Sequence, residues 1–264
     1  MPYKSVVAKF SAIGGEQIHC MHPLNQHMYI GTGPYGILYR TIDGLSLEEF
    51  WRTDDTHVTA VQDYGNALFV GTSPGGQILM HNFNTENRFH YVTTGDYRVN
   101  SFAVNDGVLY AGTYPSGLVL SFDGRIWKNE YDSYGAGVTD LVSYGDALYV
   151  FCLGLEFVPY FKDGEWGVMQ NGETDFSMST KTKATTNISV LSKSRNYDHS
   201  FNCAVVAGGK LFFAPYNQCN LYSFDGSAVE IAYQWDGSRI QDLAAVGQNQ
   251  LAVAVDDMVY VGEV

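Results

Sequence analysis

Histidine and cysteine side chains that lie close together in a sequence are candidate ligands for zinc or a related metal. The run Ile18–His22 contains His19, Cys20 and His22, and a zinc site needs such side chains to converge at about 2.0–2.3 Å from the ion. On a β-strand, neighbouring side chains point to opposite faces, so His19 and Cys20 are expected to diverge. We therefore expect polar side chains with satisfied hydrogen bonds here, and we predict no metal or other cofactor.

Two aspartates form a second candidate for chemistry. Asp140 and Asp242 occupy equivalent positions in the repeated pattern that is described below. Two carboxylates that face each other can hold a cation or act as a general acid and a general base. Solvated polar groups are the alternative, and the sequence alone leaves open whether the two side chains converge.

Tyrosine and arginine side chains form a third candidate set, which suits binding rather than catalysis. Tyrosine offers a broad contact area at a low entropy cost and is enriched at interfaces. The candidates lie in turns and loops between predicted strands and are Tyr35, Tyr97, Arg98, Tyr114, Tyr216 and Arg239. Together with nearby carboxylates they suit a protein surface, a peptide or a sugar. The alternative is that the tyrosine rings only pack over the turns and have no role in binding.

The segment 171–198 differs in composition from the rest of the chain, because it is rich in serine and threonine. It contains four basic residues, which are Lys181, Lys183, Lys193 and Arg195. On a chain of net charge −13, this local basic excess predicts an inserted loop or arm that contacts a partner. Long loops in compact domains are often functional or disordered, so disorder without function is the alternative.

Motifs of the common catalytic classes give no support to an enzyme. No P-loop and no H-E-x-x-H motif occurs in the chain. No segment shows the apolar spacing of a helix, so no strand–serine–helix elbow of the hydrolase type is predicted. We therefore predict a protein that is not an enzyme.

The elements that position these residues come from a repeat of about 40 residues. Three segments match closely, at 29–40 (YIGTGPYGILYR), 69–80 (FVGTSPGGQILM) and 110–121 (YAGTYPSGLVLS). Three further segments match less closely, at 149–160, 212–223 and 252–263. Each repeat contains short β-rich runs that are separated by turn signals such as Asp-Gly and Pro-x-Gly.

Repeats of this length with four strands each are typical of a β-propeller. We predict an all-β, six-bladed propeller that forms a single domain over residues 1–264. The second strand of each repeat is apolar on both faces, as expected for a sheet packed between two neighbours. The sixth repeat offers only three strands, and the run 4–13 can supply the fourth. The N-terminal strand is therefore expected to complete the last blade and close the ring.

This architecture predicts where the candidate residues lie. The loops between blades share a face with the middle hairpin turns, so the tyrosine and arginine set should surround one mouth of the central channel, together with Asp54, Asp55, His57, Asp96 and Tyr134. The inner strands would line the channel with Asn100, Asp140, Asn202 and Asp242 in two registers. Hydrolytic six-bladed propellers place such groups around a calcium ion, which makes a calcium-dependent hydrolase or lyase a less favoured alternative.

The repeats resemble those of β-propeller proteins with a G-T-x-P-x-G turn and a following F-D-G turn. The first motif occupies 31–36, 71–76 and 112–117, and the second occupies 122–124 and 224–226. Compact acidic propellers of this kind look similar to accessory proteins of bacteriophage particles. The resemblance implies a decorating component, or a tail or collar component, of a virion.

Composition narrows the range of partners and locations. The 15 Lys and Arg residues stand against 28 Asp and Glu residues, and such an acidic surface repels nucleic acid. No stretch approaches the roughly 18 apolar residues of a membrane span, and the first residues lack the apolar core of a cleaved signal peptide. We expect a cytoplasmic or virion protein that binds a protein partner within a larger assembly. A glycan-binding module is the alternative, with Tyr35, Tyr114 and Tyr216 as stacking platforms.

Overall fold

The computed structural model describes residues 4–5, 16–41, 47–155, 157–170, 173–175, 201–216, 218–235, 240–246, 249–255 and 258–264. Every regular element in this part of the chain is a β-strand. A search of the same residues for a helix long and apolar enough to cross a membrane found none.

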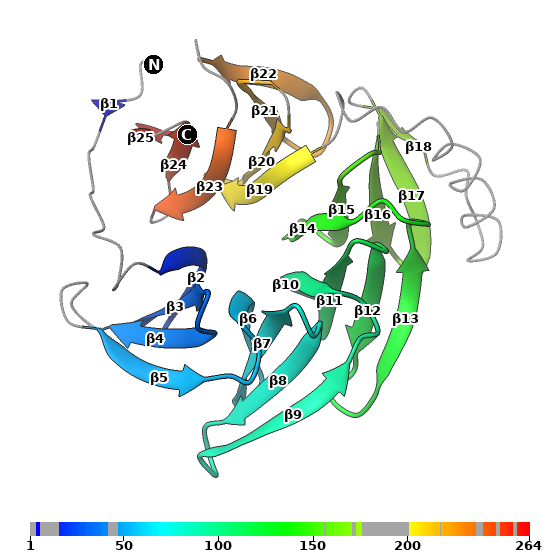
Figure 1. The fold of residues 1–264 in the computed structure, drawn as a ribbon. Coiled ribbons are helices and arrows are strands. Elements are labelled where there is room, and N and C mark those ends of the chain that lie inside the picture. Colours follow the sequence, from blue (N-terminus) through cyan, green and yellow to red (C-terminus); the bar gives the residue numbers. More distant parts are fainter. Residues whose placement is uncertain are drawn as a thin grey trace.

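The strands form six antiparallel sheets arranged around a central axis (Figure 1). The first sheet consists of β2 (Gln17–Leu24), β3 (His27–Gly33), β4 (Ile37–Thr41) and β5 (Glu48–Arg52). The second consists of β6 (His57–Tyr64), β7 (Ala67–Ser73), β8 (Gln77–Asn82) and β9 (Asn87–Thr93). The third consists of β10 (Arg98–Asn105), β11 (Val108–Tyr114), β12 (Leu118–Phe122) and β13 (Trp127–Asp132).

The other three sheets complete the ring. The fourth consists of β14 (Val138–Tyr144), β15 (Ala147–Cys152), β16 (Val158–Lys162), β17 (Glu165–Gln170) and β18 (Glu173–Asp175). The fifth consists of β19 (Phe201–Ala207), β20 (Lys210–Pro215), β21 (Asn220–Phe224) and β22 (Val229–Gln234). The sixth consists of β23 (Ile240–Val246), β24 (Gln250–Val255), β25 (Met258–Glu263) and β1 (Lys4–Ser5). The six-bladed β-propeller predicted from the repeat is confirmed.

The ring is closed as the strand count predicted. β1 pairs antiparallel with β25, with Lys4 opposite Val261 and Ser5 opposite Tyr260. The N-terminal strand therefore becomes the outermost strand of the last blade, while residues 6–13 of the predicted strand lie outside the described residues.

The structure describes three residues of the segment 171–198, and the inserted loop or arm predicted there stays a prediction. Residues Glu173–Asp175 form β18, a fifth strand that pairs with the edge of β17. This pairing extends the fourth sheet by one strand, because the outer edge of a blade offers unpaired backbone groups to an adjacent segment. Residues 176–200 lie outside the described residues.

The glycine that begins each close repeat is explained by the packing of one blade on the next. A Cβ atom on Gly31 would lie 2.6 Å from Val58 Cγ1, and one on Gly71 would lie 2.7 Å from Val99 Cγ1. Such distances are too short for two carbon atoms, so glycine lets the inner strand of the next blade approach the second strand closely. The buried valines thus form the seams between blades.

A β-bulge recurs at the same place in every blade. The pairing of the first two strands shifts by one residue at His19, Thr59, Asn100, Thr139, Asn202 and Gln241. A bulge leaves one extra residue unpaired and redirects its side chain. The regular alternation of side chains along each inner strand is therefore interrupted at these six positions.

Candidate functional site

Four bulge side chains tie neighbouring inner strands together. Thr59 donates to the carbonyl of Val99, and Asn100 Nδ2 donates to the carbonyl of Val138 at 2.8 Å. In the next two blades, Thr139 Oγ1 donates to Phe201 O and Asn202 Nδ2 donates to Ile240 O, each at 2.9 Å. We call these four residues the channel belt. Each links its blade to the next one, so Asn100 and Asn202 stabilise the contact between neighbouring blades.

Asp140 joins three blades one residue above the belt. Its Oδ1 accepts hydrogen bonds from Ser101 Oγ at 2.8 Å and from its neighbour's amide, Leu141 N, at 2.9 Å. Its Oδ2 accepts a hydrogen bond from Ala204 N at 3.1 Å. Burial raises the pKa of Asp140 to about 6, and the negative charge of Asp242 contributes to the rise. These contacts give the carboxylate a structural task between blades 3, 4 and 5.

Asp242 lies close enough to Asp140 for their charges to interact, but the two carboxylates share no hydrogen bond. Asp242 accepts a hydrogen bond from Leu243 N at 2.8 Å, and burial raises its pKa. No group of three or more His, Cys, Asp or Glu side chains in the described ranges is placed to hold a metal ion. The alternative of a calcium ring that also uses the amides of Asn100 and Asn202 stays a prediction.

The three potential ligands in Ile18–His22 have different surroundings. Cys20 Sγ approaches the carbonyl of Val58 at 3.9 Å, whereas His22 Nε2 contacts Asp63 Oδ1 at 2.7 Å. His19 packs instead against the ring of His57. His19 and Cys20, which were predicted to diverge, therefore have different contacts.

One face of the ring carries the turns and loops predicted to form a mouth. The backbone of the loop 53–56 bonds to Gly36, and the loops at 94 and 133–135 bond in the same way to the turns at Gly76 and Ser116–Gly117. We call this surface, formed by the turns 33–36, 73–76 and 114–117 and the loops 53–56, 94–97 and 133–137, the mouth face. The peptide bonds before Pro34, Pro74 and Pro115 are cis, and Gly36, Gly76 and Gly117 adopt positive φ as predicted.

Two carboxylates predicted to face a ligand at this mouth bind the turns instead. Asp96 Oδ2 accepts hydrogen bonds from Thr113 Oγ1 at 2.7 Å and from Ser116 N at 3.0 Å. One repeat earlier, Asp55 makes the same contacts with blade 2, where it accepts hydrogen bonds from Thr72 Oγ1 and from Gly75 N. We call this arrangement the acid–threonine clamp. The clamp fastens the loops before blades 2 and 3 to the blade that follows, so the carboxylates of Asp55 and Asp96 are used in structural contacts.

Blade 1 carries a version of the same clamp. Glu16 accepts hydrogen bonds from Thr32 Oγ1 and, at 3.0 Å, from the hydroxyl of Tyr39. The sequence signal was present, since an acid precedes the threonine of the G-T-x-P turn at nearly constant spacing in three repeats. This regular spacing distinguishes Asp55 and Asp96 from groups that face a ligand.

The predicted binding tyrosines differ in their exposure. The side chains of Tyr35 and Tyr97 are 59% and 57% exposed, and the neighbouring Tyr134 is 50% exposed. Tyr114 is half-buried because its ring covers Gly137 of the next blade, where a Cβ atom would lie 2.1 Å from the ring. Tyr216 is also half-buried. The structural alternative therefore fits Tyr114, while Tyr35 and Tyr97 are open to solvent.

The basic candidates are divided between the described and undescribed parts of the chain. Arg98 begins β10 and is half-buried, with a buried Nε atom that has no hydrogen-bond partner. The other basic candidates lie outside the described residues, and they are Lys181, Lys183, Lys193, Arg195 and Arg239. Their predicted binding role stays a prediction.

Two turns carry glycine spacings that are shared with enzyme motifs. Residues 31–36 match G-x-G-x-x-G and residues 71–75 match G-x-S-x-G. Those motifs act where a strand leads into a helix, whereas here each turn joins two antiparallel strands, β3 to β4 and β7 to β8. Ser73 is also buried. The spacings therefore reflect the blade turn and supply neither a phosphate site nor a nucleophile elbow.

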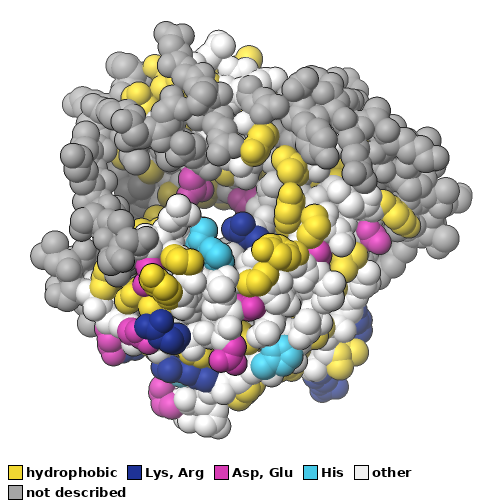
Figure 2. All heavy atoms as spheres, in the orientation of Figure 1, with side chains coloured by type: hydrophobic (Ala, Val, Ile, Leu, Met, Phe, Trp, Pro, Cys, Tyr) yellow, Lys and Arg dark blue, Asp and Glu magenta, His cyan; other side chains and the backbone are white. Residues whose placement is uncertain are grey.

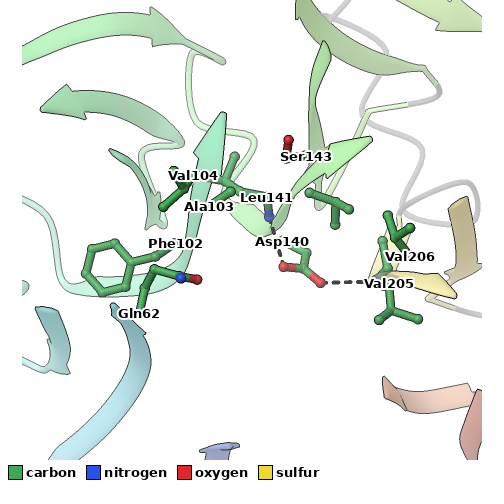
Figure 3. A pocket seen from close by; sticks show the side chains of 11 residues that line it. Gln62, Phe102, Ala103, Val104, Asp140, Leu141, Ser143, Val205 and Val206 are labelled. Atoms are coloured by element: carbon green, nitrogen blue, oxygen red, sulfur yellow. Dashed lines mark hydrogen bonds between the residues drawn. The ribbon is translucent and has the colours of Figure 1, made fainter. Parts of the chain in front are cut away.

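An open pocket of about 360 Å³ lies at the other end of the inner strands (Figure 3). Residues of β6, β10, β14 and β19 line it, and they include apolar side chains such as Phe102 and Val205 as well as the polar residues Gln62 and Ser143. Asp140 contributes its carboxylate, which is held by the hydrogen bonds to Leu141 and Ala204.

Comparison with known proteins identifies the fold. No protein-family model matches the chain, and no curated protein matches it. The extracellular domain of the one-component system protein BT4673 from B. thetaiotaomicron is 13% identical, with a TM-score of 0.68 over 97% of this chain. This chain spans only 34% of that protein's chain.

Two other solved propellers are similar over most of their length. The WD40 repeats of RRP9 are 11% identical, with a TM-score of 0.65, and the match covers 94% of this chain and 77% of that one. YCF48, solved with a D1 peptide bound, is 12% identical with a TM-score of 0.65, and the match covers 98% of this chain and 81% of that one. At these identities the likeness shows the fold alone. The propeller fold is one that fits a protein-interaction module.

Proposed function

We propose that the chain is a non-enzymatic protein-interaction module that binds a protein partner through its mouth face. The observation that carries this proposal is the group of exposed tyrosines there, Tyr35, Tyr97 and Tyr134, on a face whose carboxylates Asp55 and Asp96 are occupied in clamps. Exposed tyrosines on a rigid scaffold provide contact area with little loss of side-chain entropy on binding.

The geometry favours a protein partner over the alternatives. A glycan site built on Tyr35, Tyr114 and Tyr216 would use one exposed ring and two half-buried rings. A calcium-dependent enzyme would need Asp140 to exchange its hydrogen bonds with Ser101 and Ala204 for metal ligation. We further propose that the partner belongs to a larger assembly. The resemblance of the repeats to accessory propellers of phage particles favours a virion as that assembly.

Chemical crosslinking in the producing cells, followed by mass spectrometry, tests the proposed face. The mouth variant Tyr35→Ala/Tyr97→Ala/Tyr134→Ala should lose a partner that the unaltered chain recovers. A matched control, Ile126→Ala/Ile231→Ala, removes side chains that are 55% and 59% exposed near the outer strands β13 and β22. The control should retain the partner. Retention of every partner by the mouth variant, at an unchanged thermal midpoint, would refute the proposal.

A further inference from the structure

Arg98 is a cationic side chain whose burial no ion pair in the described structure explains. Its Nε atom is buried and has no hydrogen-bond partner. In the ranges that the structure describes, no carboxylate lies within ion-pair distance of its guanidinium. Burial lowers the pKa of Arg98, as expected for a cation removed from water. A buried donor that has no acceptor reduces stability, so this Nε–H group needs an explanation.

His57 lies on the equivalent position of the preceding blade. His57 is opposite Ser73 in the ladder of β6 and β7, as Arg98 is opposite Tyr114 in the ladder of β10 and β11. Thr56 Oγ1 contacts His57 Nδ1 at 2.7 Å, and the ring lies over Gly33, where a Cβ atom would be 2.0 Å from it. These contacts fix the orientation of the imidazole without using its Nε2 atom.

His19 occupies the bulge position of blade 1 without making the hydrogen bond of the channel belt. At its bulge position, the residues of the next four blades donate to a neighbouring carbonyl. His19 instead packs edge-on against His57, with 5.0 Å between the ring centroids, and its Nε2 atom is buried without a partner. Burial lowers the pKa of His19, and the positive charges of Arg98 and His57 lower it further. The three side chains therefore share one site across blades 1, 2 and 3.

The chemistry of this site favours an anion. Figure 2 shows histidine and cationic side chains together at the central opening, with acidic side chains across from them. The acids Asp140 and Asp242 belong to blades 4 and 6 and accept hydrogen bonds from backbone amides. A planar carboxylate matches the donor pattern of a guanidinium. A net charge of −13 disfavours phosphates and polyanions, since repulsion grows with the charge of the ligand.

We propose that Arg98, His19 and His57 form a receptor at the channel mouth for a single carboxylate of a peptide partner. This inference rests on the proposed function and specifies what the mouth face recognises. The guanidinium would take up the carboxylate, while the two imidazoles supply N–H donors beside it. The exposed ring of Tyr97, next in sequence to Arg98, would contact the peptide that carries the group.

Nuclear magnetic resonance of the arginine Nε–H and histidine side-chain signals provides a direct test on the full chain. Three probes distinguish the sources of the carboxylate: N-acetyl-Gly-Gly-Ala with a free C-terminus, the same peptide as its amide, and N-acetyl-Gly-Glu-Gly amide. We expect at least one of the two carboxylate peptides to shift the Arg98 and His19 signals in a saturable way. The amide without a carboxylate should leave them unchanged. Binding of the first peptide alone identifies a chain terminus, whereas binding of the third identifies an acidic side chain.

The variant Arg98→Gln should weaken this binding at least tenfold, and the control Arg52→Gln, in an exposed pair with Glu49, should leave it unchanged. Because Arg98 is half-buried, the thermal midpoint of Arg98→Gln is measured alongside, and His19→Gln serves as a second variant if the first fails to fold. Absence of saturable shifts with both carboxylate peptides overturns the receptor. Binding that survives both variants overturns it as well. Either result leaves the crosslinking test of the mouth face unaffected, so failure of the two proposals can be told apart.

Discussion

Removal of the Asp55 carboxylate should weaken the seam between blades 1 and 2 by an amount that can be estimated from its contacts. The carboxylate accepts hydrogen bonds from Thr72 Oγ1, which is fully buried, and from Gly75 N at 3.1 Å. Hydrogen bonds to a charged group contribute about 1.5–3 kcal/mol each, and a buried partner left unsatisfied adds to the loss. Asp55→Ala should therefore lower the free energy of unfolding by about 3 kcal/mol.

Urea denaturation followed by tryptophan fluorescence, with a double-mutant cycle, measures this effect. For a chain of this size, about 3 kcal/mol corresponds to a fall of roughly 6–12 °C in the thermal midpoint. Thr72→Val removes the other half of the bond without changing the side-chain volume much. The double variant should be less destabilised than the sum of the single variants by about 1–2 kcal/mol, because the two groups interact directly.

Asp54→Ala is the matched control, since Asp54 is the exposed neighbour of Asp55. Its effect should stay within about 0.5 kcal/mol, as for most surface substitutions. If Asp55→Ala is no more destabilising than Asp54→Ala, or if the double variant is strictly additive, the clamp does not stabilise the ring. In that case the Asp55 carboxylate is again a candidate for contact with a ligand.

Three further effects follow from the seams and the channel. Gly71→Ala should lower the free energy of unfolding by about 1–3 kcal/mol in the same denaturation assay, because its new Cβ would meet Val99 at 2.7 Å. Asn100→Ala should cost about 1–2 kcal/mol, since it removes the bond to Val138 O; an unchanged urea midpoint would show that the belt is dispensable. The folded-state pKa of Asp140 is raised from 3.8 to about 6, so its contribution to stability is present below pH 4 and is lost as the pH rises through 6. The unfolding free energy should therefore fall by about 2–3 kcal/mol from this group over that interval. The difference between the unaltered chain and Asp140→Asn should show this fall, and equal pH profiles for the two would contradict it.

The architecture could be predicted from the sequence because it depends on features that recur. Turn glycines, apolar second strands and a spacing of about 40 residues appear several times, and each repetition reduces the chance of coincidence. The closing strand followed from a count of strands, and β1 pairs with β25 accordingly. Asp-Gly pairs also predicted their turns well, as the positive φ of Asp106 and Gly107 shows.

The site was harder to predict because side-chain partners depend on distances that no pattern encodes. Alternation predicted that His19 and Cys20 diverge, but the strand carries a β-bulge at His19, and no pattern indicated that His19 would meet His57 from the next blade. Asp96 was expected to face a ligand, although its bonds go to Thr113 and Ser116. β18 was missed because three residues at a sheet edge carry too little periodicity to be distinguished from a loop.

Side chains at equivalent positions in successive blades can be divided into those that make the repeated contact and those that do not. Residues that perform the same task in successive blades, such as Asp55 and Asp96, are explained by the seams that every blade must make. A side chain that occupies a repeated position without performing the repeated task needs another explanation. His19 stands at a belt position without a belt hydrogen bond, and its Nε2 is buried and unpartnered, as is the Nε of Arg98. Leaving such donors unsatisfied lowers the free energy of unfolding. A ligand that accepts hydrogen bonds from them would therefore gain binding free energy at this site.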